Sequence, residues 1–272
     1  VVDSSMLSLT LEYQDILGLF FAGQINGTSG YEEAAGQGLI AGINAACSIL
    51  GKPRFILPSS ISYIGVMIED LVTSSRDEPY RLFTARSSNR LYIREDNAIV
   101  RLISYRNGLG LNSEIDYYQE KFEKEYNLLI NLCKEFKYLP TVENIDYFSR
   151  MSYGGLKSVV SLNELIVRSS LDCVKTLQEE CISFNLKFMK GVIEAVAISL
   201  KYEGYIARAN NENSKISKLD SRKIDWEKII DQNNISNECS QRIRSIRPET
   251  FSQLRKILGI RPATIAFVAN SL

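Results

Sequence analysis

Histidine is absent from this chain of 272 residues. Without an imidazole, the chain offers no Ser-His or Cys-His nucleophile pair, no histidine-ligated zinc and no histidine general base. Acid–base chemistry would fall to carboxylates, Lys, Tyr, Cys or a bound cofactor. The sequence therefore gives no catalytic and no metal-binding residue.

Paired cysteine motifs, long apolar runs and a net charge are missing as well. The five cysteines have no Cys-x-x-Cys spacing, which favours buried free thiols over a zinc ribbon or a redox site. No segment approaches the roughly 18 apolar residues of a membrane helix. With 32 basic and 32 acidic residues, the chain is not a uniformly basic nucleic-acid binder. We expect a cytoplasmic protein with no membrane partner, and the start at Val1 fits a fragment or a processed product.

The first informative segment is a glycine-rich turn. The apolar run 17–23 predicts a buried strand, and the helix expected from Tyr31 to Cys47 follows the turn at 23–30. Backbone N–H groups at a helix start attract oxyanions, so the turn could bind a dinucleotide, although its glycines could equally serve close packing. Neither G-x-G-x-x-G nor a P-loop motif occurs. The candidate ligand residues are Gly23, Gln24, Asn26, Gly27, Thr28 and Gly30.

An arginine-rich stretch follows between residues 76 and 106, where seven arginines and no lysine occur. Guanidinium groups bind phosphate or carboxylate in a bidentate way, which favours anion contacts. The alternative is a network of ion pairs within the chain, and Arg94 beside Glu95 and Asp96 is the position where we favour that alternative.

The remainder predicts a mainly α fold with a small α/β part. Ser113 is a plausible N-cap for an amphipathic helix that reaches Phe136, and 63–72 is a short helix or strand. Further helices are expected at 162–171, 192–210, 237–245, 250–258 and 262–272. Within the second of these, Lys201, Tyr205 and Arg208 share a face, and Gly204 suggests a close-packed neighbour.

Several runs carry a resemblance to a known family. The longest is Gly18–Ala35, which reads GLFFAGQINGTSGYEEAA, and others are EPYRLFT at 78–84, REDNA at 94–98, KYEGYIAR at 201–208 and GIRPA at 259–263. They resemble the tRNA uridine 5-carboxymethylaminomethyl modification enzymes, also called glucose-inhibited division protein A. The resemblance covers essentially the whole chain, most strongly from Thr10 to Arg106.

The resemblance implies a fold and a function. It implies the closing segment of an FAD-binding Rossmann-like domain (1–60), a helical connecting region with the arginine patch (61–200) and a carboxyl-terminal helical subdomain (201–272). The implied function is FAD-dependent addition of the carboxymethylaminomethyl group at C5 of the wobble uridine of tRNA, together with a tRNA-modification GTPase. The implied partners are tRNA, the GTPase and a missing amino-terminal half of the FAD domain, and the intact enzyme is expected to be a homodimer.

The family pattern also implies roles for individual residues. Gly23 and Gln24 resemble the place where many flavoproteins set Gly-Asp against the ribitol, and the other turn candidates would let the backbone approach FAD. The residues implied in tRNA or partner contact are Arg81, Arg86, Arg90, Arg94, Lys201, Tyr205 and Arg208. The chain departs from the pattern at Ser88-Asn89 and at Ile99.

Two other functions remain open. The dinucleotide fingerprint and the redox cysteines of the family are missing from this chain, so activity of the isolated chain is doubtful. A non-catalytic helical adaptor, or a remnant, that binds tRNA or the GTPase without flavin is the alternative. An unrelated flavin reductase predicts a nicotinamide (NAD) site, for which the residues give no support.

Overall fold

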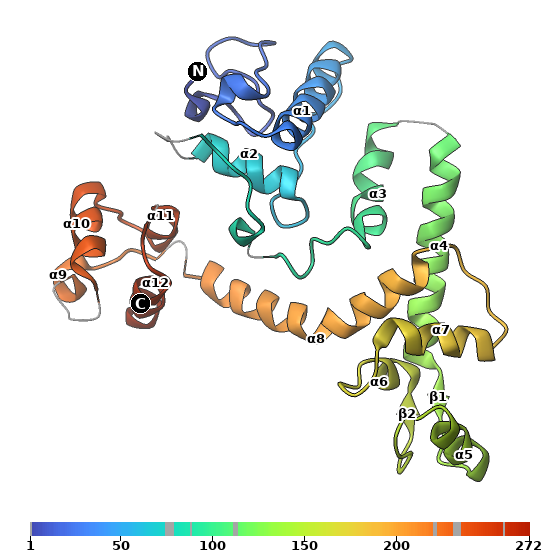
Figure 1. The fold of residues 1–272 in the computed structure, drawn as a ribbon. Helices are drawn as coiled ribbons and strands as arrows, with labels where there is room; N and C mark the ends of the chain where they lie inside the picture. Colours follow the sequence, from blue (N-terminus) through green and yellow to red (C-terminus); the bar gives the residue numbers. More distant parts are fainter. Residues whose placement is uncertain are drawn as a thin grey trace. The chain divides into compact units, whose positions relative to one another are not determined.

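The computed structural model describes residues 2–73, 79–87, 89–110, 114–219, 222–230, 235–257 and 259–272. It confirms the mainly α fold, because helices make up nearly all of the regular structure and the named strands form one small sheet (Figure 1). The chain divides into two compact units, Val1–Gly204 and Tyr205–Leu272. The candidate ligand turn and the arginine-rich stretch both belong to the first unit.

Among its described residues, the amino-terminal part of the first unit contains the helices α1 (Tyr31–Ile49), α2 (Tyr63–Thr73) and α3 (Ala98–Leu109). Short 3-10 turns lie at Ser4–Met6, Gln24–Asn26 and Thr84–Arg86. A small core joins α1 and α2 to the amino-terminal segment, whereas Ile99 and Val100 of α3 pack against the core that contains α4. The small core contains Leu7, Leu11, Ile40, Ala41, Met67, Ile68, Leu71 and Tyr80. The helix expected after the glycine turn is thus confirmed, and 63–72 proves to be helical; α3 was not recognised within the arginine-rich stretch.

The buried strand predicted at 17–23 is wrong. The segment pairs with residues 11–13 only through isolated contacts, such as the bridge between Glu12 and Phe20 and the hydrogen bond from the Phe21 amide to the Leu11 carbonyl (3.1 Å). Leu17 is 88% exposed. A strand is maintained by repeated hydrogen bonds to a neighbour along its length, and single bridges do not supply them here.

The rest of the first unit is a second helical core. Its elements are α4 (Glu114–Glu135), α5 (Val142–Arg150), α6 (Leu162–Ile166), α7 (Cys173–Ser183) and the first part of α8 (Val192–Ser217). Strands β1 (Lys137–Tyr138) and β2 (Val160–Ser161) pair in antiparallel fashion.

On α4 the side chains of Phe122, Tyr126, Leu129 and Cys133 are all buried, as the helical spacing predicted, whereas Ile115 and Tyr118 at the same spacing are 62% and 46% exposed. Ser113 lies outside the described residues. Helix α7 was missed, and α6 is shorter than expected. Between these elements, the buried Glu180 carboxylate accepts hydrogen bonds from the hydroxyls of Tyr138 and Tyr147.

In the described part of the second unit, short helices follow the end of α8. They are α9 (Trp226–Ile229), α10 (Asn237–Ile246), α11 (Phe251–Lys256) and α12 (Pro262–Ser271). The local sequence defines their starts, since Ser236 and Thr250 accept hydrogen bonds as N-caps and Pro262 occupies the first turn of α12. The three helices predicted in this part of the sequence are confirmed within a few residues.

Among the described residues, no helix combines the length and the apolar character that crossing a membrane requires. The same residues contain no group of three or more Cys, Asp or Glu side chains arranged to hold a metal ion.

Candidate functional site

The 3-10 segment of the glycine-rich turn lies between two glycines whose backbone conformations other residues rarely adopt. Gly23 has φ 86° and Gly27 has φ 81°, a region that side chains with a Cβ avoid. Gly30 then serves as the N-cap of α1 without any side-chain cap. These dihedral angles explain why the sequence has glycine at 23 and 27.

A buried side chain that the sequence analysis did not single out organises this turn. Gln37 on α1 is 0% exposed. Its Oε1 accepts hydrogen bonds from the Gly23 amide (3.0 Å) and from Nδ2 of Asn26 (2.8 Å), and its Nε2 donates to Oγ1 of Thr28 (2.9 Å). The available signal was a polar residue three positions before Ile40, on the inward face of a helix rich in Ala and Gly.

The predicted ligand residues therefore divide into two groups. Asn26 and Thr28 are buried and bond within the turn, where Asn26 also donates to the Phe21 carbonyl and Thr28 to the Gly23 carbonyl. Gln24 is exposed. One polar atom is left over: Oδ1 of Asn26 is buried without a hydrogen-bond partner among the described residues.

Glu33 connects the start of α1 to the segment 79–83. Its buried carboxylate accepts a hydrogen bond from the Leu82 amide (3.1 Å), and this bond holds the pKa of Glu33 below its ordinary value. A Cβ added at Gly30 would lie 1.6 Å from Oε2 of Glu33, so a side chain there would require the Glu33 carboxylate to move. The bond between the Leu82 amide and the Glu33 side chain was not predicted from the sequence.

The segment 79–83 also bonds to the turn itself. The Tyr80 amide donates to the Gly27 carbonyl (2.8 Å), and Thr28 and Tyr80 form a parallel bridge. The turn and 79–83 are thus joined by a main-chain hydrogen bond, and the start of α1 is joined to 79–83 through the Glu33 side chain.

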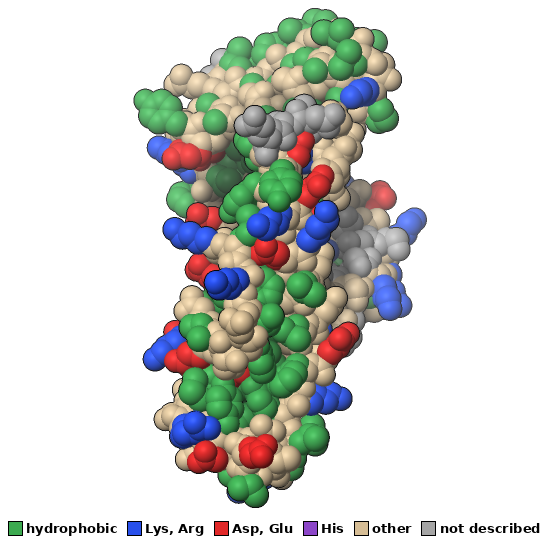
Figure 2. Space-filling model, turned by 90° about the vertical axis from the view of Figure 1, so that its right-hand side faces the viewer, with side chains coloured by type: hydrophobic (Ala, Val, Ile, Leu, Met, Phe, Trp, Pro, Cys, Tyr) green, Lys and Arg blue, Asp and Glu red, His purple; other side chains and the backbone are tan. Residues whose placement is uncertain are grey.

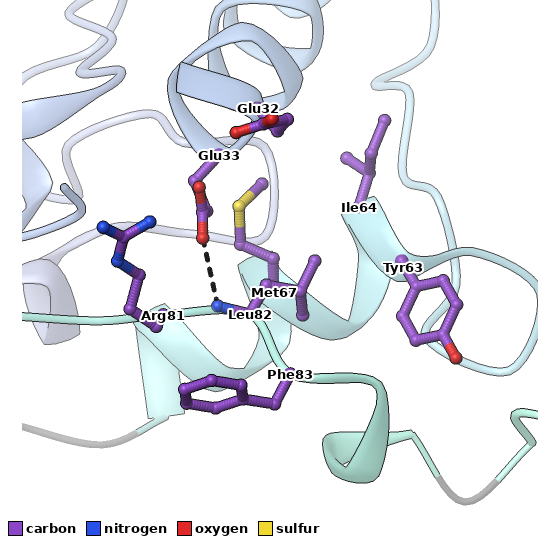
Figure 3. Close-up of a pocket in the computed structure, with 8 residues that line it drawn as sticks. All are labelled: Glu32, Glu33, Tyr63, Ile64, Met67, Arg81, Leu82 and Phe83. Carbon is purple, nitrogen blue, oxygen red and sulfur yellow. Dashed lines mark hydrogen bonds between the residues drawn. The ribbon is translucent and has the colours of Figure 1, made fainter. Parts of the chain in front are cut away.

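A cavity of about 510 Å³ lies where this segment meets α1 and α2 (Figure 3). Its apolar wall comes largely from α2 and Leu82, and carboxylates and a guanidinium lie at its border. Phe83 is 61% exposed. The lining residues are Glu32, Glu33, Tyr63, Ile64, Met67, Arg81, Leu82 and Phe83.

The arginines named from the sequence fall into two sets. Arg94 forms two hydrogen bonds to the Asp96 carboxylate (2.9 and 2.8 Å), so the expected ion pair is present, and it also donates to Oγ of Ser199 (2.9 Å). Arg86 lies 4.9 Å from the centre of the Tyr80 ring and 3.5 Å from the Asp70 carboxylate.

The second set is exposed. Arg81 and Arg90 are exposed, and within the described part of the chain their guanidinium groups make no ion pair or hydrogen bond that meets ordinary distance criteria. Among the arginines of the patch that the structure describes, these two side chains offer guanidinium groups to an external anion without first breaking an ion pair.

In the middle of α8, the side chains of Lys201, Tyr205 and Arg208 are all exposed. The Arg208 guanidinium lies 4.9 Å from the centre of the Tyr205 ring. The close-packed neighbour expected at Gly204 is not there, because a Cβ at that position meets nothing within 4 Å among the described residues.

On the face drawn in Figure 2, basic and acidic side chains alternate with hydrophobic ones and no large area of a single charge is visible. This mixed surface agrees with the zero formal charge of the sequence. Contacts of this face to an anionic partner would therefore depend on individual basic side chains.

Comparisons with known proteins agree with the resemblance found in the sequence. The sequence model of the family described as "Glucose inhibited division protein A" matches residues 1–53. The tRNA uridine 5-carboxymethylaminomethyl modification enzyme MnmG of onion yellows phytoplasma is 41% identical over 267 residues, which are 97% of this chain and 42% of that protein. MnmG of Lactobacillus johnsonii is 41% identical over 98% of this chain and 42% of its own.

A solved structure gives the same result. GidA of Aquifex aeolicus is 40% identical and superimposes with a TM-score of 0.67, covering 98% of this chain and 42% of that one. The resemblance inferred from the sequence motifs is thereby confirmed. The chain spans about 42% of the length of the relatives it matches.

Proposed function

Because this chain is homologous over nearly its whole length to part of the MnmG (GidA) proteins, we propose that it is the part of a tRNA uridine 5-carboxymethylaminomethyl modification enzyme that completes the FAD site and contacts tRNA. The observation that carries the cofactor assignment is the turn 23–30 directly before the start of α1, where Gly23 and Gly27 have left-handed φ angles and Gly27 is only half-buried. Such a turn lets a planar ligand approach the backbone closely.

The residues of the turn fit an uncharged part of FAD. Oδ1 of Asn26 is a buried acceptor without a partner among the described residues, and the exposed Gln24 offers a neutral amide for the ribitol or the ring. The Glu33 carboxylate covers the first turn of α1 beside Gly30. Its charge would repel a phosphate there, so the turn is better suited to the ring or ribitol than to the pyrophosphate.

When bound, FAD would supply the redox step of the reaction. The contribution of this chain is positional. Gln24 would hydrogen-bond the cofactor, Gly23, Gly27 and Gly30 would permit its close approach, and Gln37 holds the turn in shape through three hydrogen bonds. Arg81 and Arg90 bind the tRNA backbone through their exposed guanidinium groups.

The partners follow from the length of the relatives and from the family plan. A segment that carries the dinucleotide fingerprint would supply the rest of the FAD domain, because this chain has no such motif. The second unit and the exposed Lys201, Tyr205 and Arg208 are the surface for tRNA or for a tRNA-modification GTPase, which acts with the enzyme on the wobble uridine. The intact enzyme is a homodimer in this proposal.

One observation favours the second candidate function, a helical adaptor without flavin. The side chains of Thr28 and Gln37, and the amide nitrogen of Asn26, bond to one another and to the main chain of the turn. The turn can therefore keep its shape without a ligand, as it would in an adaptor that binds only tRNA or the GTPase.

The experiment that separates the two functions is an absorbance titration. FAD is added to the purified chain alone and to the chain mixed with the separately produced amino-terminal half of a homologous enzyme, and unbound FAD is removed. A protein-bound flavin band only in the mixture supports the enzyme, and tRNA modification by the mixture is assayed next. Folded proteins that retain no flavin in either sample contradict the cofactor assignment and favour the adaptor.

A further inference from the structure

The cavity beside the glycine turn combines features that suit a nucleobase attached to a phosphate. Its volume of about 510 Å³ falls in the range of small-molecule sites. Met67, Ile64 and Leu82 supply apolar wall, and Phe83 exposes 61% of its surface at the border (Figure 3). An exposed phenylalanine beside an apolar cavity is a stacking surface for an aromatic ring.

The charged groups around the cavity distinguish its sides. The Glu33 carboxylate is already bonded to the Leu82 amide, whereas the exposed Glu32 also lines the cavity. A carboxylate only accepts hydrogen bonds, so Glu32 suits a base edge that presents an N–H donor and disfavours a phosphate. Arg81 lies at the same border with an exposed guanidinium, which suits a phosphate oxygen.

Hydrogen bonds connect this cavity to the turn. The Tyr80 amide bonds to Gly27, and the Leu82 amide bonds to Glu33 on the first turn of α1. Arg81 and Phe83 lie on either side of Leu82, so these bonds fix their main chain relative to the glycine turn.

We propose that this cavity receives a single unpaired uracil of the RNA substrate, with its ring stacked on Phe83, its N3–H edge toward Glu32 and the adjoining phosphate on Arg81. The inference rests on the proposed function, from which it takes the RNA and the uridine. It adds the place where the base lies and the residues that bind it. Enzymes that modify a base commonly remove it from the stack and hold it against aromatic side chains in this manner.

The test measures how much the unpaired base contributes to RNA affinity, and whether that contribution requires the ring of Phe83. Fluorescence anisotropy of the full chain is recorded with a labelled RNA stem-loop that presents one unpaired uridine, and with the same stem-loop carrying an abasic site at that position. The variants are Phe83→Leu, which keeps an apolar side chain without the ring, and Arg81→Gln. Tyr117→Leu, at an aromatic residue of α4 that is 75% exposed, is the matched control.

The unmodified chain should bind the uridine probe about tenfold more tightly than the abasic probe, since a stacked base contributes a factor of this order. Phe83→Leu should lose that difference, and Tyr117→Leu should keep it. Arg81→Gln should weaken both probes and lower the slope of log K against log salt by about one. Circular dichroism confirms that each variant is folded.

Equal affinity of the unmodified chain for the two probes, or a difference that survives in Phe83→Leu, overturns the proposal. Its failure is separate from a failure of the cofactor assignment, which the flavin titration measures without RNA. A chain that discriminates the base through Phe83 but retains no flavin in any mixture supports the base cavity and contradicts the enzyme.

Discussion

Replacing Gln37 by leucine tests whether this buried amide maintains the glycine turn. Leucine has a similar size and is compatible with a helix, so the change removes mainly hydrogen bonds. The Gly23 amide and Oγ1 of Thr28 each lose their bond to Gln37, and Nδ2 of Asn26 retains only the Phe21 carbonyl. The Gly23 donor is left buried without this partner.

The expected loss follows from these atoms. A buried donor left unpaired costs about 1–3 kcal/mol, and the weakened bonds at Asn26 and Thr28 bring the total to about 2–4 kcal/mol. For a unit of this size, that loss lowers the midpoint of thermal unfolding by about 6–12 °C. The matched control is Gly38→Ala on the same helix, where the new Cβ meets nothing within 4 Å; this change should raise stability by about 0.5–1 kcal/mol.

The assay separates the two units of the chain. Far-UV circular dichroism follows both units, whereas Trp226, the only tryptophan, reports fluorescence from the second unit alone. Gln37→Leu should lower the midpoint of the circular dichroism transition assigned to the first unit and leave the fluorescence transition in place. Equal midpoints for Gln37→Leu and the unsubstituted chain would refute the role of Gln37.

Three further predictions concern thiols, pH and arginines. Burial raises the pKa of Cys133 to about 12 and that of Cys181 to about 11; an Ellman titration of the folded chain at pH 8 should therefore leave both thiols unmodified, and fast labelling of either one in a mass-spectrometric map contradicts their burial. The pKa of Glu33 in the folded chain lies below its ordinary value of 4.5, so the stability it contributes is present above pH 4.5 and is lost as the pH falls through the folded pKa; the difference in unfolding free energy between the chain and Glu33→Gln, measured in urea, should shrink from pH 6 to pH 3, and a constant difference argues against it. Arg94→Ala should lower stability by about 1–3 kcal/mol because it leaves Asp96 unpaired. Arg90→Ala should leave the melting temperature unchanged and weaken RNA binding in the anisotropy experiment. The opposite pattern would contradict a structural role for Arg94 and an RNA-binding role for Arg90.

The sequence predicted the regular helices better than the turn and its surroundings. On α4, the steps from Phe122 to Tyr126 and from Tyr126 to Leu129 place one face inward, and this periodicity is readable without a structure. The run 17–23 is equally apolar, yet Leu17 is 88% exposed. Apolar composition indicates a strand only where neighbouring segments provide hydrogen bonds, and those neighbours cannot be identified from local sequence.

The candidate site shows the same division. Local sequence identified the glycines of the turn, because their backbone angles are a property of the residue itself. It did not identify Gln37 or the bond between Glu33 and Leu82, since these contacts join residues 14 and 49 positions apart. The pairing of Arg94 with Asp96 was foreseen because those residues are two positions apart.

By itself, the sequence determined the absence of imidazole chemistry, the mainly α composition, the glycine turn before α1 and the similarity to a tRNA-modifying family. These follow from residue type and short-range order, which every conformation of the chain shares. Only the tertiary structure decided which polar groups are buried and which of the arginines are available to an anion. It also brought Arg81 and Phe83 beside the turn, because hydrogen bonds between distant segments form only once the chain has folded and excluded water from between them.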